Sequence, residues 1–260
     1  MTTSDLIPAA TILMLRDGPA GLEVFMVVRH HQIDFASGAL VFPGGKIDAG
    51  DNDAAAFCDG VEHASSEQIA FQVGAIREAF EECGVLLARA DNETQLISGD
   101  RLATLDVYRE KIHAGEITFV DFLTQERLRL ACDCLQPFAH WITPEMMPKR
   151  FDTWFYLAAA PGDHLAIHDG SESVDSIWIE PTAALQGAKD GTYTVIFPTR
   201  LNIEMLAESP SLETAMTDAQ SRNIKTVLPW TEQRSDGNYL CIPADAGYAI
   251  AEERLPDREG

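Results

Sequence analysis

The pattern of apolar and polar positions divides the chain into short apolar runs and longer stretches with helical periodicity. Runs of β-branched and bulky apolar residues are typical of strands, and the first two are separated by a turn at residues 17–19. Apolar positions spaced three and four apart predict amphipathic helices. The predicted strands cover residues 9–15, 22–28, 138–142, 153–159, 177–179, 227–230 and 239–242. The predicted helices cover residues 65–83, 101–113, 119–131, 181–186, 198–208 and 211–222.

The region before the first helix has a different character. Residues 38–45, with the sequence GALVFPGG, form an apolar run that leads into a Pro-Gly-Gly turn, and the Asp-, Ala- and Gly-rich residues 48–66 are expected to form a loop. One mixed α/β domain over residues 1–260 accounts for the whole pattern. It carries a helical insertion at about residues 91–134 and a loop at about residues 52–66.

The helix at residues 65–83 has the clearest boundaries and two distinct faces. Ser65 and Gln68 match a capping box, and Gly84 is placed to end the helix. At about 100° per residue, apolar side chains gather on one side and three glutamates on the other. The apolar stripe is Ile69, Val73, Ile76, Phe80 and Cys83, and the acidic face is Glu78, Glu81 and Glu82.

The three glutamates are unfavourable for the helix taken alone. Carboxylates at i, i+3 and i+4 repel one another, and the negative end of the helix dipole lies close to them. A hard divalent cation reverses this argument, because Mg²⁺ prefers carboxylate oxygens and keeps water and phosphate as its other ligands. The alternative is a solvated acidic face in a chain that is acidic overall.

The composition and net charge of the chain exclude some classes of function. The formal net charge is −22, from 41 acidic and 19 basic residues, so the surface repels nucleic acid. A small phosphorylated substrate meets the same repulsion unless a dication bridges it. The five cysteines form no C-x-x-C pair, which favours reduced thiols in a cytoplasmic protein. We expect neither a signal peptide nor a membrane span. The region from residue 211 onward packs on the sheet or on the partner in a homodimer.

Residues 77–85, with the sequence REAFEECGV, resemble the second half of the box that defines the Nudix hydrolases. That half reads R-E-U-x-E-E-x-G-U, where U is a bulky aliphatic residue. The first half, a glycine followed by a glutamate, is matched by Gly45 and Asp51. The chain departs from the pattern in three ways: Asp51 replaces the glutamate, Ala79 is small, and an insertion splits the box ahead of Arg77.

The split box is similar to one branch of the family, which includes animal coenzyme A diphosphatases. Further similarity lies in HWITP at residues 140–144, RFDTWF at residues 150–155 and FPTR at residues 197–200. Arg29 followed by GALVFPGG offers part of a coenzyme A signature found elsewhere in the family. This resemblance covers most of residues 9–205.

The resemblance implies a fold, a cofactor and a set of roles. The fold is an α/β/α sandwich with a mixed sheet. Glu78, Glu81 and Glu82, with the carbonyl of Gly45, would bind Mg²⁺ or Mn²⁺, and Arg77 would hold a neighbouring carboxylate in place. The metal would lower the pKa of a water that attacks phosphorus.

The same resemblance suggests a general base and substrate-binding residues, some of which lie outside the box. Glu172 and Glu78 are both candidates for the general base. The alternative for Glu172 is an exposed acidic residue in a loop, without a catalytic role. Arg29, at a strand end beside His30 and His31, and Arg150 are candidates for substrate binding, as is the glycine turn with Gly44 and Gly45. Arg29 could instead be a solvated strand end, and Arg150 could instead pair with Asp152.

Three functions therefore compete. The first is hydrolysis of coenzyme A or acyl-coenzyme A to a phosphopantetheine and adenosine 3′,5′-bisphosphate. The second is the same chemistry on ADP-ribose, dinucleotides or nucleotide sugars, because specificity is set outside the box. The third is a Nudix-fold ligand sensor or scaffold without catalysis.

Overall fold

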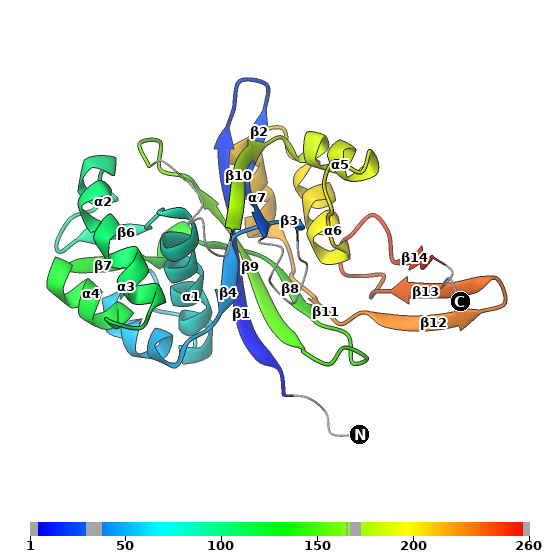
Figure 1. Cartoon of the computed structure of the whole chain (residues 1–260), viewed down its shortest axis with the longest axis horizontal. Coiled ribbons are helices and arrows are strands. Elements are labelled where there is room, and N and C mark those ends of the chain that lie inside the picture. The colour runs from blue at the N-terminus through cyan, green and yellow to red at the C-terminus, as the bar shows by residue number, and fades with distance from the viewer. Residues whose placement is uncertain (1–4, 30–37, 165, 167–172, 257–260) are drawn as a thin grey trace.

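The computed structural model describes residues 5–29, 38–164, 166 and 173–256. A twisted sheet runs through the middle of the molecule, with helices on both faces (Figure 1). This arrangement confirms the α/β/α sandwich that the resemblance implied. Among the helices that the structure describes, none combines the length and the apolar character that crossing a membrane requires.

The central sheet has eight strands and mixes parallel with antiparallel pairs. Its main path follows the order β10-β2-β1-β9-β8-β11, with β3 added beside β2 and β4 beside β1. The β1–β9 and β8–β11 pairs are parallel, and the other pairs are antiparallel. The strands are β1 (Ile7–Asp17), β2 (Leu22–Arg29), β3 (Leu40–Val41), β4 (Gly44–Lys46), β8 (Gln136–Ile142), β9 (Phe151–Ala159), β10 (Ser173–Ile179) and β11 (Thr226–Val227).

Alternation along β1 explains why both faces of the sheet need a cover. Ile12 and Met14 belong to one apolar cluster, and Leu13 and Leu15 belong to the other. Successive strand side chains point to opposite faces, so each face of β1 is apolar. One face packs under α1 (Ser66–Cys83). The other packs under α5 (Pro181–Lys189), α6 (Phe197–Leu206) and α7 (Leu212–Ser221).

The predicted loop at residues 48–66 is only partly correct. Residues 49–57 form the 3₁₀ helix η1 (Ala49–Phe57), which is followed by β5 (Cys58–Asp59). The β5 strand joins a small sheet with β7 (Leu128–Ala131) and β6 (Ala88–Ala90). Ala54, one of the alanines of this segment, is fully buried in the core.

Helices form within residues 91–134, but two of the predicted helix boundaries there are wrong. The helix predicted at 101–113 is divided into α2 (Gly99–Leu105), the short η2 (Asp106–Tyr108) and α3 (Arg109–His113). The helix predicted at 119–131 ends early as α4 (Phe119–Glu126), because Arg127 adopts a left-handed conformation with φ 53°. Residues 128–131 then pair as β7, so tertiary pairing overrides their helical pattern.

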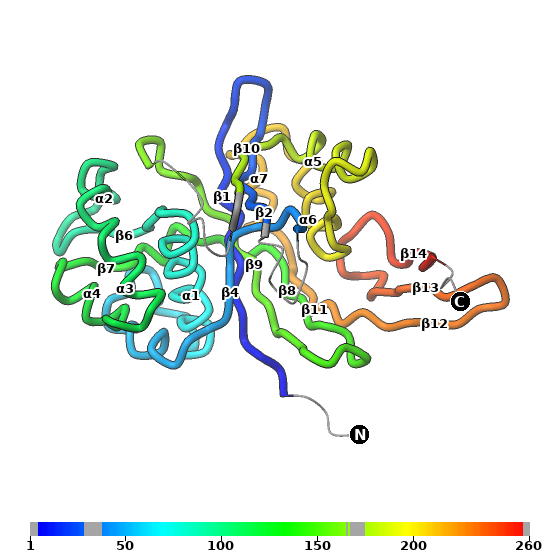
Figure 2. Tube along the Cα trace, viewed as in Figure 1, coloured from blue at the N-terminus to red at the C-terminus, as the bar shows by residue number. Residues whose placement is uncertain are grey.

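A separate three-stranded sheet follows the sandwich near the C-terminus. It consists of β12 (Trp230–Arg234), β13 (Gly237–Cys241) and β14 (Glu252–Arg254). The run predicted as one strand at 227–230 is therefore shared between β11 and β12. Figure 2 shows this sheet and the helical insertion on opposite sides of the central sheet. The division into a single domain stays a prediction.

Candidate active site

Helix α1 begins and ends where the sequence predicts. The Ser65 hydroxyl accepts a hydrogen bond from the Gln68 amide at 3.2 Å, and the Gln68 side chain accepts one from the Ser65 amide at 2.9 Å. At the other end Gly84 has φ 66°, a left-handed conformation that glycine adopts without steric cost. Its amide donates to the carbonyl of Phe80 at 2.9 Å. These two caps fix how far the glutamates lie from the helix end.

Glu78, Glu81 and Glu82 are largely shielded from solvent, so the solvated acidic face is the wrong alternative. The Glu78 side chain is 13% exposed and the Glu81 side chain 8%, and Glu82 as a residue is 7% exposed. The apolar stripe is buried as predicted, apart from the partly buried Ile69. Both faces are covered because α1 lies between the sheet and η1. A buried carboxylate needs a compensating partner.

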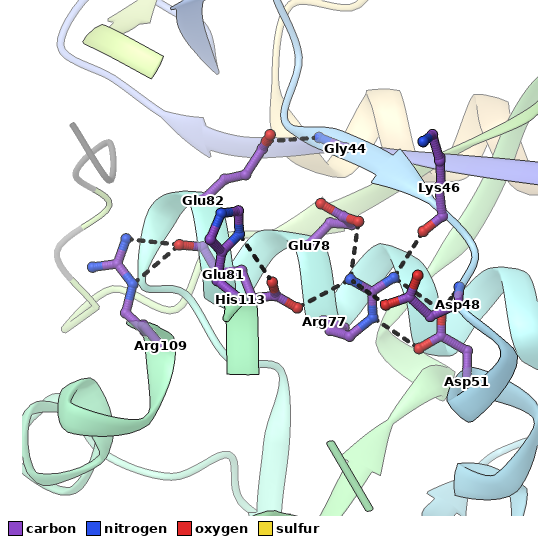
Figure 3. A network of polar contacts seen from close by, with 10 residues as sticks. All are labelled: Gly44, Lys46, Asp48, Asp51, Arg77, Glu78, Glu81, Glu82, Arg109 and His113. Atoms are coloured by element: carbon purple, nitrogen blue, oxygen red, sulfur yellow. Dashed lines mark hydrogen bonds and ion pairs between the residues drawn. The ribbon is translucent and has the colours of Figure 1, made fainter. Parts of the chain in front are cut away.

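Arg77 connects these carboxylates to the segment upstream of the helix (Figure 3). Its Nε and Nη2 donate to the two carboxylate oxygens of Asp51 at 2.8 and 3.0 Å. Nη2 also donates to the carbonyl of Lys46 at 2.8 Å. Nη1 donates to Glu78 at 2.9 Å and to Glu81 at 3.0 Å. All five N–H groups of a guanidinium are thus used, and we call this set the Arg77 network.

Asp51 is the most buried acid of the Arg77 network. It is 1% exposed, and its Oδ2 also accepts the amide of Asp48 at 2.8 Å. The 3₁₀ turns of η1 bring it back over α1, so the split box still delivers its carboxylate to Arg77. Burial opposes the charge on Arg77, but the Asp51 hydrogen bond and the nearby glutamates raise its pKa above the ordinary value. Arg77 is therefore a permanent cation.

The site carries more negative than positive charge. One guanidinium meets the carboxylates of Asp51, Glu78 and Glu81, and Glu82 lies on the same helix. Burial raises the pKa of Glu81, and the positive charge of Arg77 opposes that rise. Excess charge in a poorly solvated site is costly. A hard dication would relieve it, and oxygen ligands of this kind suit Mg²⁺ or Mn²⁺.

In this structure the carboxylates of Glu78, Glu81 and Glu82 do not point toward a common centre. Within the described residues, no group of three or more His, Cys, Asp or Glu side chains is arranged to hold a metal ion. The reason lies in their present contacts: Glu78 and Glu81 face Arg77, while Glu82 accepts the Gly44 amide at 2.9 Å. The donor chemistry and the charge fit a dication, and side-chain rotations would be needed to bring the carboxylates together.

The glycine turn lies directly against the glutamates. A Cβ atom on Gly45 would sit 2.5 Å from Oε1 of Glu78, closer than real atoms approach. Gly44 has φ 154°, and a Cβ there would meet the Ala10 carbonyl oxygen at 2.3 Å. The structure therefore places Gly44 beside Glu82 and Gly45 beside Glu78, and the roles of both glycines in binding stay predictions.

Arg150 does not join this group. It is 8% exposed, and its Nε donates to the carbonyl of Thr143 at 3.1 Å, within the connection between β8 and β9. That connection lies on the far side of the central sheet strands from α1 (Figure 1). Asp152, the other partner considered for Arg150, pairs with His140. The placement favours a structural role for Arg150 over substrate contact.

Two further predictions fall partly or wholly outside the described residues. The backbone of Arg29 ends β2 and pairs with Ser173, but its side chain is not described. Glu172, His30 and His31 lie outside the described residues altogether. Their roles stay predictions.

The aromatic residues of β8 and β9 divide as the alternation predicts. Phe155 and Trp141 are buried, whereas Trp154 lines a cavity of about 390 Å³ between the first turns of α1 and the end of α7. The α1 glutamates do not line this cavity. It is therefore separate from the Arg77 network.

Two residues of the helical insertion contact the site without any local signal in the sequence. The Nε and Nη2 of Arg109 donate to the backbone carbonyl of Glu81 at 3.3 and 3.1 Å. Nδ1 of His113 lies 3.6 Å from Oε2 of Glu81. Both belong to α3, and only packing of the insertion against α1 brings them there (Figure 3).

The comparisons with known proteins agree on one family. The NUDT19 Nudix domain model matches residues 55–203. The acyl-coenzyme A diphosphatase NUDT19 of Xenopus laevis is 23% identical, over 87% of this chain and 71% of that protein. The human protein of the same name is 26% identical, over 90% of this chain and 74% of its own length.

A solved structure supports the same assignment. A Nudix hydrolase from Alicyclobacillus acidocaldarius superposes with a TM-score of 0.67 at 28% identity, covering 83% of this chain and 97% of that one. The domain match spans more than half of the chain, and the box residues contact one another around Arg77. The chain therefore belongs to the Nudix hydrolase family and is a Nudix diphosphatase.

Proposed function

We propose that this enzyme hydrolyses the diphosphate bond of coenzyme A or an acyl-coenzyme A, releasing a phosphopantetheine and adenosine 3′,5′-bisphosphate. The observation that carries the chemistry is the set of three shielded α1 glutamates at the glycine turn. Arg77 bonds Glu78 and Glu81, and the Gly44 amide bonds Glu82. The choice of substrate is supported by relatives named acyl-coenzyme A diphosphatases, which align over most of the chain.

Glu78, Glu81 and Glu82 would hold Mg²⁺ or Mn²⁺, together with the carbonyl oxygen of Gly45. When bound, the ion supplies charge neutralisation for the diphosphate and lowers the pKa of a water molecule. The excess negative charge of the site supports this proposal, since the carboxylates outnumber the guanidinium that they face.

Arg77 would position these carboxylates and would not contact the substrate. Its five N–H groups are already occupied by Asp51, the Lys46 carbonyl and two glutamates. Its fixed, planar fork holds Glu78 and Glu81 on one side while Asp51 anchors the other. Loss of this positioning would change the ligand geometry even though Arg77 is not a ligand.

The proton from the attacking water would be taken by Glu78 or Glu172. Glu78 is supported by its place beside Gly45, whereas Glu172 lies outside the described residues and rests on the resemblance alone. A pH–rate profile of Glu172→Gln separates the two: full activity with an unchanged profile removes Glu172 from the mechanism.

Substrate anions would meet Arg29 at the end of β2 and the backbone amides of the glycine turn. Arg150 remains a weaker proposal, because it is buried and bonded to Thr143. Arg29→Met tests the stronger one: a rise in KM for coenzyme A with little change in kcat is expected if its charge serves binding alone.

The deciding experiment is incubation of the purified chain with coenzyme A and Mg²⁺ or Mn²⁺, followed by chromatography of the products. We expect adenosine 3′,5′-bisphosphate and phosphopantetheine, and no products in the presence of EDTA. ADP-ribose, a dinucleotide and a nucleotide sugar serve as comparators. A higher kcat/KM on any of these than on coenzyme A and acyl-coenzyme A would overturn the substrate assignment.

We further propose a reducing, cytoplasmic location. All five cysteines are free thiols, and four of them are buried. Free buried thiols are expected where glutathione keeps cysteines reduced. Fractionation of cells that express the chain at its native level would test this proposal.

A further inference from the structure

The last turn of α1 depends on a residue from another part of the chain. An α-helix leaves its last four carbonyl groups without partners inside the helix. Here the amide of Gly84 donates to Phe80 and that of Val85 to Ala79. The carbonyl of Glu81 is instead met by the Nε and Nη2 of Arg109, at 3.3 and 3.1 Å. The guanidinium of Arg109, from the helical insertion, therefore caps one of the last carbonyl groups of the box helix.

The contact is close and specific to this position. A Cβ on Gly84 would lie 3.0 Å from Nη1 and 3.3 Å from Cζ of Arg109, so the guanidinium lies directly against the end of the helix. The Arg109 side chain is 17% exposed, and Nη1 also donates to Asp106 at 3.2 Å. A cation here also opposes the negative end of the helix dipole. These contacts hold Arg109 in place from both sides.

The helical insertion packs against α1 and can therefore support the end of that helix. Phe122 of α4 is fully buried and stacks on Phe80 of α1 with ring centroids 5.3 Å apart. One turn further along α3 from Arg109, His113 lies 3.6 Å from the Glu81 carboxylate. The backbone and the side chain of Glu81 are thus contacted from α3, while Arg77 contacts the same side chain from α1 itself.

We propose that Arg109 is a positioning residue that fixes the peptide of Glu81 and, through it, the orientation of the Glu81 and Glu82 carboxylates for metal binding. This inference rests on the proposed function. Arg109 touches neither substrate nor metal and acts through the last turn of α1. The insertion then has a role in the reaction of this enzyme, because it supplies the support that the helix end lacks.

The test uses Arg109→Met and Arg109→Lys in the full-length chain. Mn²⁺ affinity is measured by electron paramagnetic resonance, kcat and KM are measured with coenzyme A, and thermal unfolding is recorded. We expect Arg109→Met to weaken Mn²⁺ binding and to lower kcat by about 10- to 100-fold, the usual cost of losing an outer-shell partner. Arg109→Lys, with one donor in place of the fork, should fall between Arg109→Met and the wild type.

Arg101→Met is the matched control. Arg101 belongs to the same insertion and pairs with Glu126, not with α1. It should leave Mn²⁺ affinity and kcat unchanged. If Arg109→Met lowers only the unfolding temperature, with Mn²⁺ affinity and kcat equal to wild type at a temperature where the variant is folded, Arg109 is merely structural and the inference is overturned. A wild-type chain that binds no Mn²⁺ and cleaves no diphosphate overturns the proposed function as well.

Discussion

Two arginines of this protein make nearly the same hydrogen bonds in opposite surroundings. Arg77 is bidentate to Asp51 at 2.8 and 3.0 Å, and its side chain is 5% exposed. Arg234, in the C-terminal sheet, is bidentate to Glu252 at 2.9 and 2.8 Å, and its side chain is 32% exposed. Arg77 also bonds Glu78 and Glu81, and Arg234 also bonds Glu232. Both guanidinium groups thus bridge more than one carboxylate, and they differ chiefly in burial.

The glutamate partners of the two arginines respond in opposite directions. The hydrogen bond from Arg234 lowers the pKa of Glu252, as expected of an exposed carboxylate beside a cation. Burial raises the pKa of Glu81 even though Arg77 lies 3.0 Å away. Water solvates both charges of an exposed ion pair, so the pair itself adds little stability. A buried carboxylate lacks that solvation and depends on charged partners, so a bound cation would stabilise it.

Replacing Arg77 should give the largest effect. Arg77→Met leaves the carboxylate of Asp51 buried without its cation, and breaking a buried ion pair from one side costs about 3–5 kcal/mol in the free energy of unfolding. Urea denaturation of the variant would measure it. The double variant Arg77→Met/Asp51→Leu removes the orphaned charge and should recover part of the loss. No recovery would mean that the pair is not the main contribution.

Replacing Glu82 should act on catalysis with little effect on stability. Glu82→Gln keeps the shape of the side chain but removes the charge offered to a metal, so we expect kcat to fall by roughly 10²–10³-fold, as for loss of one preorganised electrostatic group. Steady-state kinetics at saturating Mg²⁺ checks this. Glu67→Gln, an exposed position in the first turn of the same helix, is the control. Equal activity of the two variants would contradict the assigned role of Glu82.

Adding a methyl group at Gly45 should produce a smaller, purely geometric effect. In Gly45→Ala the new Cβ displaces the Glu78 carboxylate, whose flexible side chain can yield. We expect kcat to fall by about tenfold while the denaturation midpoint stays close to wild type. Gly50→Ala is the control, since a Cβ there meets nothing within 4 Å. Unchanged kcat in Gly45→Ala would mean that the position of Glu78 does not matter.

Replacing Arg234 should produce the smallest effect. Arg234→Met breaks the hydrogen bonds to Glu232 and Glu252 at the surface, where water can take over both carboxylates. We expect no measurable change in the urea midpoint or in kcat, determined beside Arg77→Met under the same conditions. A loss of stability close to that of Arg77→Met would show that burial is not what separates the two arginines.

The box helix was predictable because its signals are local. The Ser65–Gln68 capping box, the stripe ending at Cys83 and the stop at Gly84 are each written within one or two helical turns. The chemistry of Glu78, Glu81 and Glu82 could also be proposed from their spacing. Residues 128–131 also carry a local helical pattern, but they pair with β5 and β6 as strand β7. The prediction of a helix therefore failed there.

By itself, the sequence determined where β1, β2, β8, β9 and β10 lie, where α1 begins and ends, and which of its residues are acidic. These features depend on residues that lie close together along the chain. Only the tertiary structure decided that the acidic face is buried, that Asp51 reaches Arg77 across the split box, and that Arg109 caps the helix. Those contacts join residues 26 and 28 positions apart. No periodicity spans such separations, so the packing of the insertion and of η1 against α1 determines them.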